Sequence, residues 1–331
     1  MNFIGMDIHK QFTVAVAKDL DGNKLSEDKF ENSKENFKVY LEKFPRETTK
    51  ILMESTCVWE YIFELIEELG YSAKLSNPVK TKAIAWARIK TDSVDASTLA
   101  DLLRANLVAE SYIPPKHIRQ LREITRERRT FVKQTTQLKN KIHAILIKRG
   151  IKLPYATLCK SALEWLLDKV ELEDVLRHYI SLLEYHEQEL GFIEDKIKNI
   201  SYETKDAKLL MTIPGIGSIR AMEIVAEVGE IGRFESADKL CSYAGLVPSI
   251  KQSGNTLRFG KLIKQSSKIL KSCLIEASWC AVRTKEENPL KLFYKKLSKK
   301  KGKQKAICAT ARKMCCVVHA MLRKQEEFRY S

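Results

Sequence analysis

The stretch Phe3-Ile4-Gly5-Met6-Asp7-Ile8 decides the fold of this chain, because it places one aspartate inside an otherwise apolar run. Such a run predicts a buried strand, and aspartate is depleted in strands unless it has a special task. Glu54 repeats the pattern, since it directly follows the apolar run Ile51-Leu52-Met53. We therefore expect two buried strands that each carry a carboxylate near the end.

A second pair of carboxylates lies in Thr91-Asp92-Ser93-Val94-Asp95. Asp92 and Asp95 are three residues apart, so they share one face if a helix begins near Thr91. For this pair alone, an ordinary first helical turn is the alternative, because acids are common there. Four converging carboxylates would repel one another unless divalent cations neutralised them, and Mg²⁺ prefers hard oxygen ligands. Together the four acids predict a metal-dependent nuclease centre.

The order of elements around these acids predicts an α/β domain of the ribonuclease H type. Strands are expected at 2–8, 12–18, 24–30, 50–54 and 71–75, and helices at 33–44, 58–69, 78–88 and 92–106. In that arrangement Asp7 and Glu54 come from neighbouring central strands. The last helix then brings Asp92 and Asp95 to them.

Pro114-Pro115 breaks the chain, and two long helices are expected after it, at 116–149 and 173–200. They predict an antiparallel helical hairpin with Pro154 in the connection. Its role is open between a spacer or oligomer interface and a nucleic-acid surface. The second alternative is based on the arginines of the first helix, which are Arg122, Arg126, Arg128 and Arg129.

The segment Ile213-Pro214-Gly215-Ile216-Gly217 predicts the tight loop of a helix-hairpin-helix. The free backbone amides around Gly215 and Gly217 would then meet a phosphate at the start of the second helix. A plain packing hairpin is the alternative. Further on we expect a helix at 236–243, a turn at 251–255 between short extended segments, and helices at 261–283 and 303–324.

The charge is strongly positive and unevenly distributed. Lys and Arg number 58 against 42 Asp and Glu, which gives +16. Residues 249–331 hold 21 basic and 5 acidic side chains, and residues 116–149 hold 11 and 2. Two separate positive blocks, the last containing the run Lys299, Lys300, Lys301 and Lys303, predict a polyanionic partner such as nucleic acid. A merely solvated lysine-rich surface is the alternative.

Eight scattered cysteines, with no Cys-x-x-Cys pair and no histidine spacing suited to zinc, predict reduced and mostly buried thiols of a cytoplasmic protein. Early charges at Asp7, His9 and Lys10 argue against a signal peptide. The sequence contains no apolar stretch of about 18 residues, so we expect no membrane span.

With these motifs in order, the chain resembles the DEDD transposases of bacterial insertion sequences, the family that also contains the Piv-type DNA invertases. The motifs that carry the resemblance are Gly5-Met6-Asp7, Glu54-Ser55-Thr56, Lys90 to Ala96, Ile213 to Gly217, Arg233-Phe234, Ser242 to Pro248 and Gln252-Ser253-Gly254. Several short motifs in this order are more specific than any one of them.

The resemblance implies a RuvC-like catalytic domain at 1–112, a helical coiled-coil connector at 113–204, and a mostly α-helical transposase domain with the helix-hairpin-helix at 205–331. It implies that Asp7, Glu54, Asp92 and Asp95 bind Mg²⁺ or Mn²⁺ and that Ser253 is the nucleophile. Sequence alone leaves Ser253 as a turn serine. Arg258 is a candidate phosphate contact.

The resemblance also implies partners, which are donor and target DNA, a structured bridge RNA and further copies of the chain in a dimer or tetramer. It places the protein in a bacterial cytoplasm, associated with the nucleoid. An RNA-independent Piv-type invertase or a RuvC-like junction nuclease would use the same acids. A non-catalytic scaffold that binds DNA or RNA through its basic tail is the alternative from another class.

Overall fold

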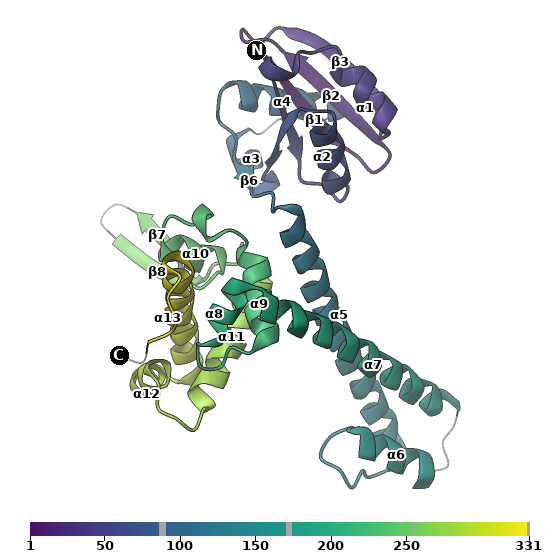
Figure 1. Cartoon of the computed structure of the whole chain (residues 1–331), viewed down its shortest axis with the longest axis vertical. Coiled ribbons are helices and arrows are strands. Elements are labelled where there is room, and N and C mark those ends of the chain that lie inside the picture. Colours follow the sequence, from purple (N-terminus) through teal and green to yellow (C-terminus); the bar gives the residue numbers. More distant parts are fainter. Residues whose placement is uncertain (86–90, 170–173, 254–255, 330–331) are drawn as a thin grey trace. The chain divides into compact units, whose positions relative to one another are not determined.

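The computed structural model describes residues 1–85, 91–169, 174–253 and 256–329, and the chain divides into two compact units, Met1–Ile113 and Pro114–Ser331 (Figure 1). Each unit has its own hydrophobic core. The predicted boundary at 112 lies next to this division. The predicted boundary at 204 lies inside the second unit and stays a prediction.

The first unit is built on one mixed sheet. Its strands are β1 (Asn2–Ile8), β2 (Phe12–Lys18), β3 (Lys24–Glu31), β4 (Thr49–Glu54), β5 (Ser72–Ser76) and the short β6 (Glu110–Ser111). They lie in the order β3-β2-β1-β4-β5-β6, with β1, β4 and β5 parallel to one another and the other neighbours antiparallel. The five predicted strands are confirmed, and β6 was not predicted.

Helices cover both faces of this sheet. They are α1 (Lys34–Leu41), α2 (Trp59–Glu68), α3 (Pro78–Ile84) and α4 (Asp92–Arg104), with a 3₁₀ turn at Arg46–Thr48. Ile4, Met6 and Ile8 of β1 belong to the core that α1 and α2 complete, whereas Phe3 packs with residues of α4. Alternate residues of a strand point to opposite faces, so α4 covers the face that carries Phe3, Gly5 and Asp7. The predicted helix 78–88 ends earlier, at Ile84, and its residues 86–88 lie outside the described ranges.

Gly5 is the point where α4 comes closest to the sheet. A Cβ atom at Gly5 would lie 2.0 Å from the backbone oxygen of Ala96 and 2.5 Å from the backbone nitrogen of Ala100. Any side chain there would collide with the helix backbone. Glycine at this position therefore lets α4 lie directly on β1, beside Asp7.

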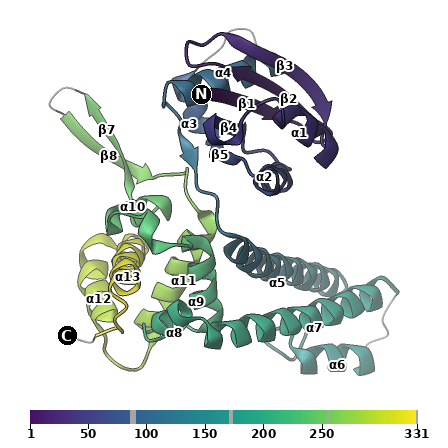
Figure 2. The ribbon, with the colours of Figure 1, turned by 45° about the horizontal axis from the view of Figure 1, so that its top comes forward.

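The second unit is mostly helical. Its elements are α5 (Lys116–Lys148), α6 (Lys160–Lys169), α7 (Asp174–Glu203), α8 (Lys205–Met211), α9 (Ser218–Val228), α10 (Ala237–Tyr243), β7 (Pro248–Ser253), β8 (Thr256–Leu262), α11 (Lys268–Arg283), α12 (Pro289–Lys301) and α13 (Lys303–Lys324), with a 3₁₀ turn at Ile231–Arg233. The predicted pair of long helices corresponds to α5 and α7, which lie side by side (Figure 2).

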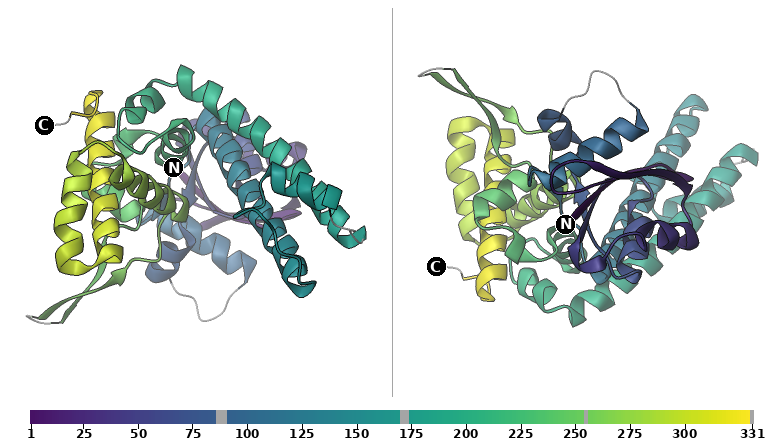
Figure 3. Two further views of the ribbon diagram at one scale, coloured as in Figure 1. Left: turned by 90° about the horizontal axis from the view of Figure 1, so that it is seen from below. Right: turned by 90° about the horizontal axis from the view of Figure 1, so that it is seen from above.

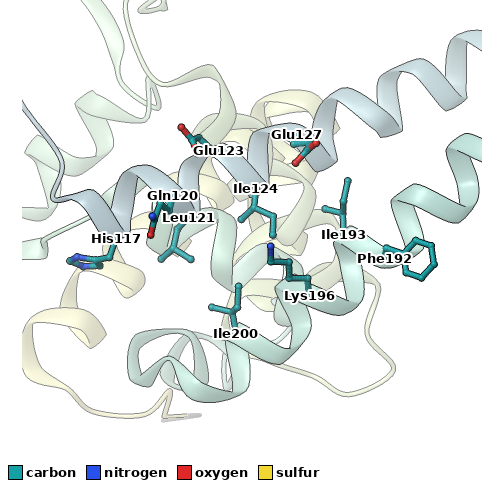
Figure 4. Close-up of a pocket in the computed structure, with 10 residues that line it drawn as sticks. All are labelled: His117, Gln120, Leu121, Glu123, Ile124, Glu127, Phe192, Ile193, Lys196 and Ile200. Carbon is teal, nitrogen blue, oxygen red and sulfur yellow. The ribbon is translucent and has the colours of Figure 1, made fainter. Parts of the chain in front are cut away.

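Apolar side chains hold α5 and α7 together, among them Ile142 and Leu146 against Ile180 and Leu183. Nearer the other end of the pair, a groove of about 660 Å³ lies between the two helices, lined by Leu121 and Ile124 of α5 and by Ile193 and Ile200 of α7 (Figure 4). The helix α6 also packs on this pair and was not predicted. Residue 173, the first of the predicted second helix, lies outside the described ranges.

One prediction for the C-terminal part is wrong. The helix expected from 261 begins at Lys268, because β8 continues to Leu262 and Ser267 caps the helix by accepting a hydrogen bond from the backbone N–H of Leu270. Lys299, Lys300 and Lys301 form the last turn of α12, a helix that was not predicted. The helices predicted at 236–243 and 303–324 are confirmed as α10 and α13.

The eight cysteines are free thiols, as expected. The prediction that most of them are buried is wrong, since Cys241, Cys273 and Cys315 are buried while Cys57 and Cys159 are exposed and the other three are intermediate. No helix in the described part of the chain is long and apolar enough to cross a membrane.

Candidate functional site

Asp7 and Glu54 lie next to each other at the ends of two parallel strands. The register of β1 and β4 pairs Gly5 with Leu52 and Met6 with Met53. Continued by one residue, this register places Asp7 beside Glu54 on the neighbouring strand. Neighbouring strands are about 4.8 Å apart, and the side chains of two residues paired across them point to the same face of the sheet. Both carboxylates therefore lie on the face that α4 covers.

The first turn of α4 brings two further acids to this face. Thr91 caps the helix by accepting a hydrogen bond from the backbone N–H of Val94, so the helix begins at Asp92 as predicted. Asp92 and Asp95 both lie in that first turn. Both are close enough to Asp7 to influence its pKa.

His9 completes the cluster, and sequence reasoning had not assigned it to the site. Its Nε2 atom lies 3.3 Å from Oδ2 of Asp7 and 3.3 Å from Oδ2 of Asp92. The ligand atoms of these three residues all lie within 4.8 Å of one another, an arrangement that could hold a metal ion. The spacing Asp7-x-His9 at the end of a strand was the available signal, because alternation puts both side chains on one face.

The electrostatics of Asp7 reflect this crowding. Burial has the largest influence and raises the pKa of the Asp7 carboxyl above its usual range. His9 lowers that pKa, and the neighbouring carboxylates of Asp92 and Asp95 raise it. Because the ionised form of Asp7 is disfavoured in the folded protein, a cation between these groups would relieve both burial and repulsion.

Ser253 lies in the second unit, as the last residue of β7. It pairs with Thr256 across the turn of the β7–β8 hairpin, and Gly254 and Asn255 of the predicted turn lie outside the described residues. Figure 3 shows this two-stranded ribbon extending away from the helices of its unit. Arg258 is exposed on β8. The predicted meeting of Ser253 with the acids stays a prediction.

The Gly215 loop lies between α8 and α9, as expected for two helices joined by a tight turn. Gly215 has a φ of +88°, and a Cβ there would lie 2.5 Å from the backbone oxygen of Ala277 and the backbone nitrogen of Ala281 in α11. Gly217 is exposed and caps α9 without a side chain. Gly215 thus has a packing role, and a phosphate contact at Gly217 stays a prediction.

The four predicted arginines of α5 make contacts inside the second unit. Arg129 donates two hydrogen bonds to the Glu223 carboxylate, at 2.8 and 2.9 Å, and Arg126 donates two to Glu227, at 2.9 and 3.0 Å. Both glutamates lie on α9 and are almost fully buried. Arg122 donates to backbone oxygens at the end of α9, and Arg128 donates to Glu194 of α7. These contacts give the arginines a structural role, and their nucleic-acid role stays a prediction.

We expect Arg129→Ala to destabilise the second unit by about 2 kcal/mol, because it removes the paired guanidinium from a buried carboxylate. Arg128 stays 3.5 Å from Glu223, which keeps the cost below that of a fully unpaired charge. Urea denaturation measures the change, with the exposed Arg329→Ala as the control. Unchanged stability in Arg129→Ala would contradict the structural role of this pair.

The lysine run is exposed, with Lys299, Lys300 and Lys301 at the end of α12 and Lys303 at the start of α13. Such a surface is accessible to a polyanion. The predicted contact between these lysines and nucleic acid stays a prediction.

Comparisons with known proteins agree with the order of these motifs. Residues 4–148 match a family model described as a transposase, the DEDD transposase of IS110 elements, and residues 207–295 match the transposase IS116/IS110/IS902 family. The chain is similar to the transposase for insertion sequence element IS1111A of Coxiella burnetii, with 26% identity over 84% of this chain and 79% of that protein.

Two other relatives cover most of the chain. The transposase for insertion sequence element IS1328 of Yersinia enterocolitica is 24% identical over 84% of this chain and 83% of its own length. The pilin gene-inverting protein of Moraxella lacunata is 26% identical over 98% of this chain and 97% of its own length. Together with the two family models, these similarities show that the chain belongs to the IS110/IS116 family of transposases, which also includes pilin gene-inverting proteins.

Proposed function

We propose that this protein cuts and rejoins DNA strands at the ends of an insertion sequence, with a metal centre formed by Asp7, Glu54, Asp92 and Asp95 and with Ser253 as nucleophile. The observation that carries the proposal is the convergence of these acids with His9 on one face of the first unit's sheet. The sheet order, with β1 between antiparallel β2 and parallel β4, supports a RuvC-like fold.

The residues of the centre fit a divalent cation. Asp7 is buried and its ionised form is disfavoured, so the site favours an added positive charge. When bound, Mg²⁺ or Mn²⁺ would neutralise the carboxylates and polarise a phosphodiester. Asp7 and Glu54 are fixed by the sheet and Asp92 and Asp95 by α4, so the acids are held in place before any substrate arrives.

Ser253 would supply the covalent chemistry. Its hydroxyl oxygen forms a bond to phosphorus while the bond between phosphorus and the DNA sugar oxygen breaks, and the departing sugar oxygen takes a proton. A second strand's hydroxyl then displaces the serine, so the strands are rejoined without an external energy source. The hairpin supports this role, because Ser253 pairs with Thr256 of β8 and that strand is exposed, so a large substrate such as DNA could reach it.

The exposed positive charge of the C-terminal part supports nucleic-acid partners. Exposed lysines at the junction of α12 and α13 and Arg258 on β8 are available for phosphate contacts. We propose that a structured bridge RNA occupies part of this basic surface and pairs with donor and target DNA. We also propose a dimer or tetramer, in which the acids of one copy meet Ser253 of another, and a coiled-coil role for α5 and α7.

Strand exchange with the purified protein, RNA and DNA ends tests the proposal. Ser253→Ala is expected to lower strand exchange at least about 10³-fold and to abolish any covalent protein–DNA adduct, while DNA binding is retained. The adjacent Gln252→Ala is the matched control and keeps the adduct. Strand exchange at the wild-type rate by Ser253→Ala would remove this serine from the mechanism.

A second candidate function is RNA-independent, site-specific inversion of DNA. It is favoured by the full-length similarity to the pilin gene-inverting protein. Sequencing of RNA that co-purifies with the protein separates the two. A single structured transcript supports RNA guidance, and recombination by RNA-free protein supports inversion without a guide.

A further inference from the structure

We propose that His9 is a metal ligand in the acidic centre and that its imidazole makes the centre prefer Mn²⁺ to Mg²⁺. This inference rests on the proposed metal centre and adds a nitrogen donor to its four carboxylates. It follows from the position of one atom, Nε2 of His9, between Asp7 and Asp92.

The distances fit three ligands of one ion. Two ligands at right angles on an ion with bonds of about 2.1 Å lie about 3.0 Å apart. Nε2 of His9 is 3.3 Å from an oxygen of Asp7 and 3.3 Å from an oxygen of Asp92, so small side-chain adjustments would let all three bind one cation.

Both contacts of Nε2 are slightly longer than an ordinary N–H···O hydrogen bond of about 2.7–3.2 Å. In an ion pair, the protonated ring would point one N–H at a carboxylate oxygen with hydrogen-bond geometry. Nε2 of His9 is buried and makes no hydrogen bond with that geometry. Nε2 lies at the same distance, 3.3 Å, from an oxygen of Asp7 and an oxygen of Asp92, so a neutral imidazole there could share one cation with both carboxylates.

The surrounding structure holds the His9 backbone and ring in this position. The backbone N–H of His9 donates to the oxygen of Phe12 at 2.9 Å, and its carbonyl accepts a hydrogen bond of 2.8 Å from the side chain of Asn32. Asn32 is in turn held by the hydroxyl of the buried Thr13, at 2.7 Å. The His9 ring lies against Phe12, with 4.5 Å between ring centroids. This support resembles the outer contacts that orient ligands in metal sites.

The donor set determines which ion is preferred. Mg²⁺ favours oxygen ligands and water, whereas imidazole nitrogen suits first-row transition ions. One nitrogen among carboxylates therefore shifts the preference toward a first-row transition ion, and Mn²⁺ is the ion of that series that carboxylate ligands also suit. If carboxylates alone held the ion, removing the imidazole would change Mn²⁺ and Mg²⁺ affinity alike.

Metal titration of the full-length protein, without DNA, tests this inference. Wild-type protein is expected to bind Mn²⁺ at least about tenfold more tightly than Mg²⁺, and His9→Asn to lose about tenfold in Mn²⁺ affinity with little change for Mg²⁺. His117→Asn, which removes an exposed histidine of α5, is the matched control and keeps the wild-type affinities. Calorimetry gives both dissociation constants.

Pulsed electron paramagnetic resonance of the Mn²⁺-loaded protein gives an independent result. Wild-type protein should show a directly bound histidine nitrogen, and the signal should be lost in His9→Asn but not in His117→Asn. Mn²⁺ binding without a nitrogen signal would overturn the role of His9 and leave the carboxylate centre intact. Failure of wild-type protein to bind either ion would overturn the metal centre itself. The nitrogen signal of the wild-type protein tests the inference by itself, even if His9→Asn does not fold.

Discussion

Asp7→Asn is expected to abolish strand exchange and, at the same time, to make the metal-free protein more stable. The loss of activity follows because Asp7 is the buried carboxylate around which the other ligands gather. We expect a fall of at least about 10³-fold, since a neutral amide replaces a central metal ligand. The gain in stability follows from the raised pKa of the same group.

The direction of the stability change is set by linkage. An acid with a pKa raised in the folded state destabilises that state when it is ionised. The destabilisation is complete above the folded-state pKa and disappears below the unfolded-state pKa. The stability difference between Asp7→Asn and wild type, without metal, should therefore be largest at neutral pH and shrink as the pH falls through the raised pKa of Asp7.

Thermal unfolding with a chelator and with Mn²⁺ measures both effects. Metal should raise the melting temperature of wild type and leave that of Asp7→Asn almost unchanged. Asp19→Asn is the control, because hydrogen bonds from Asn23 lower the pKa of Asp19 and removing its charge should give no stabilisation. A metal-free Asp7→Asn less stable than wild type at neutral pH would contradict the crowding of charges at this site.

Much of the first unit could be predicted because its sequence signals are local. The apolar run around Asp7 predicted β1, and the spacing of Asp92 and Asp95 after Thr91 predicted the start of α4. His9 was missed because its role depends on a tertiary contact, the approach of Asp92 from α4. The significance of Gly5 was missed for the same reason, since nothing in the sequence says which helix lies on it.

In the second unit, local sequence signals predicted less of the structure, because long-range contacts decide more of it. A basic cluster on an amphipathic helix predicts a solvent-facing surface, but Arg126 and Arg129 bind Glu227 and Glu223, whose burial no local pattern indicated. An extended segment after the turn at 251–255 was predicted, but the length of β8 was not, because its nearly continuous exposure shows no alternation up to Leu262. In both cases, long-range partners decided the structure.

Gly5→Ala is expected to destabilise the first unit by about 3 kcal/mol and to weaken metal binding. The added Cβ would lie 2.0 Å from the backbone oxygen of Ala96, so backbone must move, and overpacking of this kind costs up to about 3 kcal/mol. Moving α4 away from β1 also separates Asp92 from Asp7 and His9. Metal affinity should therefore fall even in molecules that remain folded.

Gly191→Ala is the matched control. Gly191 lies inside α7, and a Cβ there would meet no atom within 4 Å, so alanine should stabilise that helix by about 1 kcal/mol. Hydrogen exchange of the β1 amides reports the first unit, and Mn²⁺ titration reports the centre. If Gly5→Ala kept wild-type exchange and affinity, α4 would not lie on β1 at this distance. The acids of α4 would then need another way to reach Asp7, because the close helix–strand contact is what brings them together.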